Sequence, residues 1–226
     1  MHPLILGAGL VAAALAASTA QAAATGKPRT PSNACPAVGA AVVEHFIRAD
    51  CPDCWAADAP APAGAWRLDW IVPGADDAPL SAAALPDATE RLQRLGQPST
   101  SPHLQPARPL PGVQLKVSAG PAWQGYFGLQ MALRARRAAA LPAGATGWLA
   151  LVEALPPGSE VNSGERVLVR SVAGPLPLDG AAAGRGLSHL RALRWPTGAK
   201  PERLQARAWV EDGEGRILAL AGNRCP

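Results

Sequence analysis

The first part of the chain alternates between apolar runs and polar breaks in a pattern typical of a small α/β unit. Residues 40–47 form a short apolar run rich in valine, phenylalanine and isoleucine, which predicts a buried strand. In residues 65–72, tryptophan and leucine alternate with charged residues, which predicts a second strand. Residues 87–96 predict a helix, because they open with a capping-box pattern and end at Gly96, where a C-terminal cap belongs.

Beyond residue 112 the pattern changes to short strands separated by glycine and proline turns. Turns are predicted at Gly120-Pro121 and at residues 212–215, the second as a hairpin loop. Seven strands of this kind are typical of a β-sandwich. They are predicted at residues 113–117, 126–133, 148–153, 166–172, 187–195, 204–211 and 216–221.

These patterns predict an α+β chain with two units. A small α/β unit is expected at residues 35–100, and an all-β, sandwich-like unit at residues 113–226. Between them, residues 101–112 belong to a proline-rich stretch that predicts a linker.

The N-terminus has the form of an export signal. An apolar segment runs from Leu4 to Ala17, and Ala20-Gln21-Ala22 fits a signal-peptidase site, so residues 1–22 are predicted to be cut off after Ala22. The segment is shorter than the roughly 18 to 20 apolar residues that span a bilayer, so no membrane span is expected. Residues 23–34 are polar and are expected to be disordered. The predicted location is therefore periplasmic or secreted.

Composition and motifs exclude only a few classes of function. The net charge is +4, and the basic residues are spread along the chain, so no nucleic-acid partner is expected. The sequence has no G-x-S-x-G elbow, H-E-x-x-H motif, P-loop or glycine-rich dinucleotide turn. No cofactor is implied, and the oligomeric state is left open.

Four cysteines in an exported chain allow three disulfide connectivities. Cys51 and Cys54 are close enough in sequence to pair with each other. Cys35 and Cys225 lie near the two ends of the predicted folded region, and the termini of a domain are often close in space. We favour Cys51–Cys54 together with a structural Cys35–Cys225 bridge, and the other connectivities remain open.

Three roles are open for the C-x-x-C pair. As a redox centre, Cys51 would be the attacking thiolate at a strand-to-helix junction and Cys54 the resolving thiol. As a zinc site, the pair would be half of a four-ligand set, but no second cysteine or histidine pair exists, so no metal is expected. As a structural disulfide, the pair would only cross-link the chain and stabilise the fold.

Residues 42–58, VVEHFIRADCPDCWAAD, resemble the opening of a family of uncharacterised bacterial secreted proteins whose usual pattern is V-V-E-L-F-T-S-Q-G-C-S-S-C-P-P-A-D. The matching positions are Val42, Val43, Glu44, Phe46, Cys51, Cys54, Ala57 and Asp58. The resemblance implies a thioredoxin-like N-terminal half joined to a β-rich part. It also implies that Pro102, in Thr100-Ser101-Pro102-His103, stands where such folds place a cis-proline beside the cysteine pair.

Two functions remain from the sequence. The first is an extracytoplasmic thiol–disulfide oxidoreductase that acts on protein thiols or disulfides of the cell envelope through Cys51, Cys54 and Pro102. The second is a non-catalytic binding or structural protein of the envelope, in which the disulfides are staples. Exposure of the sulfurs separates the two, because an attacked sulfur must be reachable.

Overall fold

The computed structural model describes residues 41–57, 60–96, 102–136, 141–159, 162–179, 181 and 186–224. Residues 32–226 form one compact unit, and the fold below is that of the described residues within it. The predicted signal peptide, the segment 23–34 and the Cys35–Cys225 bridge lie outside the described residues.

The elements of the first part of the unit are mostly short. They are β1 (Ala41–Arg48), α1 (Pro52–Ala56), β2 (Trp66–Val72), the 3-10 turn η1 (Ser81–Ala83), α2 (Pro86–Leu95) and β3 (His103–Pro106). The remaining elements are strands and one further 3-10 turn. They are β4 (Val113–Trp123), β5 (Tyr126–Ala135), β6 (Thr146–Leu155), β7 (Arg166–Pro177), β8 (Leu187–Arg194), η3 (Pro201–Arg203), β9 (Leu204–Glu211) and β10 (Ile217–Gly222).

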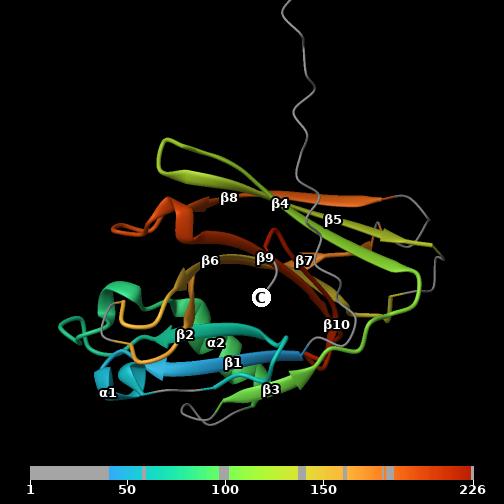
Figure 1. The fold of residues 1–226 in the computed structure, drawn as a ribbon. Coiled ribbons are helices and arrows are strands. Elements are labelled where there is room, and N and C mark those ends of the chain that lie inside the picture. The colour runs from blue at the N-terminus through green and yellow to red at the C-terminus, as the bar shows by residue number, and fades with distance from the viewer. Residues whose placement is uncertain are drawn as a thin grey trace, which may run out of the picture. The chain divides into compact units, whose positions relative to one another are not determined.

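The strands form two sheets (Figure 1). The larger has seven strands in the order β10-β9-β6-β7-β2-β1-β3. Within it β2 runs parallel to both of its neighbours, β1 and β7, and the remaining pairs are antiparallel. The smaller sheet is antiparallel, with the order β4-β5-β8.

The expectation of a thioredoxin-like α/β unit followed by a separate all-β unit is wrong. Strand β2 pairs with β7, so the N-terminal strands continue the sheet that the C-terminal strands build. The described residues contain only two α-helices, of five and ten residues, which are too few to cover both faces of a parallel sheet as an α/β unit requires. The chain is β-rich, and its two sheets pack against each other as a sandwich does.

Strands β6 and β9 are buried on both faces, which explains their nearly continuous apolar sequences. One face packs against the three-stranded sheet through leucines such as Leu149 of β6 and Leu133 of β5. The other face carries Trp148 and Trp209, whose rings stack with centroids 5.9 Å apart. Helix α2 covers this second face with Arg91, which forms ion pairs with two buried glutamates, Glu44 (2.7 Å) and Glu211 (2.5 Å).

Several local expectations are confirmed, and others are corrected. Helix α2 ends at Gly96, whose φ of 61° is the left-handed conformation that glycine adopts without strain, and the loop at 212–215 joins β9 to β10. Part of the proline-rich stretch, 103–106, is strand β3 and pairs with β1. Gly120-Pro121 is not a turn but lies inside β4 at a register shift, and the β4–β5 turn is at Gln124-Gly125, with φ values of 47° and 80°.

Within the part of the chain that the structure describes, no helix has the length and apolar character needed to cross a membrane.

Candidate functional site

Cys51 and Cys54 form a disulfide at the end of β1, as the sequence predicted, with their Cα atoms 5.3 Å apart. The chain leaves β1 at Arg48, and the amide of Cys51 donates to the carbonyl of Arg48 in a tight turn. Pro52 then begins helix α1, since its fixed φ suits the first helical position. Trp55 of α1 is buried against Ile47 and Leu168, which holds the short helix on the sheet. The disulfide is therefore fixed at a strand-to-helix junction.

A pocket of about 550 Å³ opens beside the disulfide. Its lining includes both cysteines, Pro102, His45 and Arg166. The three site residues predicted from the sequence, Cys51, Cys54 and Pro102, thus lie around one cavity. The peptide bond that precedes Pro102 involves Ser101, which is outside the described residues, so the expected cis-proline stays a prediction.

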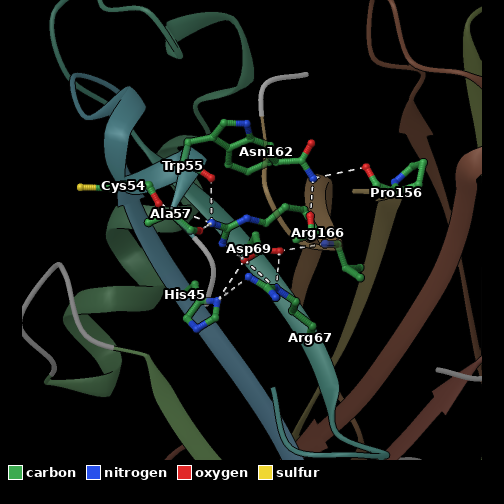
Figure 2. Close-up of polar contacts among 11 residues, drawn as sticks. His45, Cys54, Trp55, Ala57, Arg67, Asp69, Pro156, Asn162 and Arg166 are labelled. Carbon is green, nitrogen blue, oxygen red and sulfur yellow. Dashed lines mark hydrogen bonds and ion pairs between the residues drawn. The ribbon is translucent and has the colours of Figure 1, made fainter. Parts of the chain in front are cut away.

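The two cysteines differ in exposure. Cys54 is exposed and Cys51 is half-buried. Figure 2 shows the Cys54 sulfur pointing away from the neighbouring polar side chains. The sequence assigned the attack to Cys51, whereas this order of exposure favours Cys54 as the residue that a partner reaches first.

A buried polar network is centred on Asp69 of β2 and includes His45 and Arg166, two residues that line the pocket (Figure 2). Its carboxylate contacts His45 Nδ1 at 3.0 Å and accepts from Arg67 Nε at 2.8 Å and from Arg166 NH1 at 3.2 Å. The backbone amide of Val167 also donates to it, at 2.8 Å. One carboxylate therefore joins β1, β2 and the start of β7.

The ionisation of Asp69 decides which histidine nitrogen carries the proton. Burial alone would raise the pKa of Asp69, but the hydrogen bond from His45 and the charge and hydrogen bond of Arg67 outweigh it and hold this pKa below its ordinary value. An ionised carboxylate only accepts hydrogen bonds, so a hydrogen bond between the two groups requires the proton on His45 Nδ1; Arg67 NH2 lies 3.2 Å from the same nitrogen. In neutral His45 the lone pair is then on Nε2, which is buried and has no hydrogen-bond partner among the described residues.

Arg166 connects the network to the helix that carries Cys54. Its side chain is buried, and its NH2 group donates to the carbonyl of Trp55 at 2.7 Å and to that of Ala57. A longer contact, 3.4 Å, reaches the carbonyl of Cys54 itself. Since the last carbonyls of a helix lack partners within the helix, this cation satisfies the C-terminal end of α1. Arg166 therefore positions the disulfide from beneath.

His45, Asp69 and Arg166 were not predicted as site residues. Asp69 gave no signal, because it falls on the charged positions of an alternating strand. A signal was present for His45, because Glu44 and His45 interrupt an otherwise apolar strand. Charged residues in buried strands are paired or functional, so these breaks in the pattern were informative. Arg166 carried no such signal, because only the fold places it beneath α1.

The described residues include no group of three or more histidine, cysteine, aspartate or glutamate side chains arranged to hold a metal ion.

No family model matches the chain, and no curated protein sequence matches it. One solved structure, HBP35 of Porphyromonas gingivalis, is similar, with a TM-score of 0.49 and 10% sequence identity over 82% of this chain and 74% of that one. A match at that level shows neither a family nor a function for this chain.

Proposed function

We propose that the chain is an exported thiol–disulfide oxidoreductase that acts through Cys51 and Cys54. The observation that carries this proposal is the position of the disulfide: it lines an open pocket of about 550 Å³, and Cys54 is exposed. A disulfide that only staples a fold needs neither access nor a neighbouring cavity, whereas one that exchanges with a partner needs both.

The reaction is the transfer of a disulfide to a partner protein that carries two thiols. A partner thiolate attacks Cys54 Sγ, forms a mixed disulfide and displaces Cys51 as a thiolate, which takes up a proton. The second partner thiol loses its proton and attacks the partner's first sulfur, the one bonded to Cys54 in the mixed disulfide. This attack releases Cys54. The partner leaves with one disulfide, and both cysteines of this chain are thiols, so the two electrons and two protons balance.

His45 supplies the proton exchange in this proposal. Its Nε2 lacks a partner among the described residues, and the residue lines the same pocket as both cysteines. Asp69 orients the ring through Nδ1 at 3.0 Å, as a carboxylate orients a histidine base in other enzymes. In this role His45 accepts the proton that the first partner thiol loses as it becomes the attacking thiolate, and returns that proton to the Cys51 thiolate.

Serine variants of the two cysteines test the proposal and separate the two assignments of the attacked sulfur. The mature Cys51→Ser variant is expected to trap a mixed disulfide at Cys54 with a small thiol such as glutathione, and Cys54→Ser to trap much less at Cys51. The reverse order would restore Cys51 as the reactive residue. If neither variant forms a mixed disulfide above the level of denatured protein, the redox function is excluded.

A second candidate, a non-catalytic binding protein of the envelope, is favoured by a different surface. Trp123 and Tyr126 flank the turn between β4 and β5 and are 74% and 49% exposed, and Leu190 of β8 is 65% exposed. Contiguous exposed apolar patches mark interaction surfaces on soluble proteins, and Leu190 lies against Gly128 of β5, two residues from Tyr126. This candidate predicts that binding to envelope material depends on these three residues and is unchanged when Cys51 and Cys54 are both replaced.

Export and family membership are also part of the proposal. The signal-peptide pattern at residues 1–22 supports a periplasmic or secreted location, and the motif at residues 42–58 supports membership of the family of bacterial secreted proteins that it resembles. N-terminal sequencing of the protein from the periplasm or medium tests the export, with Ala23 expected as the first residue.

A further inference from the structure

A second pocket, of about 370 Å³, opens at the start of β2 and β9. Its lining includes Trp66 and Arg67 of β2, Gln205 and Arg207 of β9, and Glu165 just before β7. None of these residues lines the pocket beside the disulfide. The second pocket is therefore a separate feature of the fold.

The unusual residue of this pocket is Arg207. It is only 5% exposed, and its NH1 and NH2 groups donate to the carbonyl of Arg224 (2.7 Å) and to Gln205 Oε1 (2.6 Å). Its guanidinium carbon lies 4.4 Å from the centroid of the Trp66 ring. All three partners are neutral groups.

The other deeply buried arginines are neutralised by carboxylates. Arg91 pairs with Glu44 and Glu211, and Arg166 pairs with Asp69. Arg207 forms no ion pair with any residue that the structure describes. A buried charge without a counter-ion is costly, because its lost hydration is not offset by an ion pair.

The pKa of Arg207 is consistent with the cost of burying an unpaired charge. Burial and the nearby charge of Arg224 lower the pKa of Arg207 to about 10. The side chain is still a cation at neutral pH, but its charged form is less stable in the folded chain than in water. An anion in the pocket would remove that penalty.

We propose that this pocket binds the oxyanion group of a small ligand, a carboxylate or a phosphate, through Arg207. Arg224 and Gln205 use two of the five N–H donors of the guanidinium, which leaves three for such a group. Gln205 and the carbonyl of Arg224 fix the orientation of the side chain, and Trp66 supports its face. Glu165 is exposed at the pocket, and its charge weakens the binding of an anion there.

The site is tested by thermal unfolding and calorimetric titration of the full mature chain. Sodium phosphate and sodium acetate are each compared with sodium chloride at the same ionic strength. We expect a saturable rise in the unfolding temperature with at least one of the two oxyanions, and the larger response identifies the ligand group as phosphate or carboxylate. An equal unfolding temperature in all three salts would overturn the proposal.

Two variants make the test specific. Arg207→Met is expected to abolish the saturable response to the oxyanion, and an undiminished response in this variant would contradict the assignment. Glu165→Gln leaves Arg207 in place and is expected to bind the oxyanion more tightly, roughly two- to fivefold; unchanged or weaker binding in this variant would contradict the assignment.

Discussion

The strongest energetic prediction concerns Asp69, because one fully buried carboxylate neutralises two guanidiniums. Its side chain is 0% exposed and pairs with Arg67 at 2.8 Å and Arg166 at 3.2 Å. The substitution Asp69→Asn would keep the shape of the side chain but not its charge, and the new amide group would face N–H donors. Removal of one partner from a buried ion pair costs about 3–5 kcal/mol. We expect a loss of this size in the free energy of unfolding.

The assay is urea unfolding of the mature, oxidised protein at pH 7. The midpoint of Asp69→Asn should fall while the slope stays that of the wild type, since the area exposed on unfolding is unchanged. The matched control is Asp50→Asn, which breaks the ion pair with Arg48 between side chains that are 46% and 56% exposed, and its midpoint should equal that of the wild type. If Asp69→Asn unfolds at the wild-type urea concentration, the network does not stabilise the fold and the reasoning fails.

The pH dependence gives a second check on the same residue. The pKa of Asp69 is lower in the folded chain than in the unfolded chain, so its contribution is complete above the ordinary aspartate pKa of about 3.9 and is lost as the pH falls through the folded value. The difference between wild type and Asp69→Asn should therefore shrink below about pH 4. A difference that grows on acidification would have the wrong sign for this account.

Three further predictions follow from other parts of the molecule. His45→Gln should slow exchange of the disulfide with a dithiol by at least about tenfold, while the redox potential stays that of the wild type; an unchanged rate would remove His45 from the mechanism. Gly174→Ala should lower stability by about 1–3 kcal/mol, because a Cβ there would lie 2.3 Å from a ring atom of buried Trp148, whereas Gly213→Ala meets no atom within 4 Å and is its control; equal urea midpoints for the two would refute the packing argument. Arg91→Met should cost about 3–5 kcal/mol in urea unfolding, because two buried glutamates lose their partner, and a midpoint at the wild-type value would contradict this.

The sequence predicted most strands but not their partners. Alternation in residues 66–72 and the apolar run of β6 identify strands, because burial on one or both faces leaves a period in the sequence. This periodicity does not indicate that β2 pairs with β7, which begins nearly a hundred residues later. Because of that one pairing, the chain forms one continuous sheet instead of the two expected units. The short strand β3 was missed because it lies within a proline-rich stretch, and that stretch indicated a linker.

For the candidate site, the local motif was informative and the long-range contacts were not. Cys51 and Cys54 are neighbours in sequence, and their pairing is confirmed. His45, Asp69 and Arg166 come from three segments that only the folded sheet brings together, so spacing in the sequence could not connect them. The redox role of the pair, its export and the Cys35–Cys225 bridge remain predictions.

The most direct test of the central claim is a redox titration of the mature protein, isolated from an oxidising compartment and equilibrated with glutathione buffers of known ratio. Free thiols are alkylated at each ratio and mapped by mass spectrometry, with Cys51 and Cys54 followed separately from the other two cysteines. The account predicts that the Cys51–Cys54 disulfide opens reversibly at roughly −120 to −230 mV, the range of exported oxidoreductases. A pair that stays closed below about −300 mV would be a structural staple, and the proposed function would be wrong.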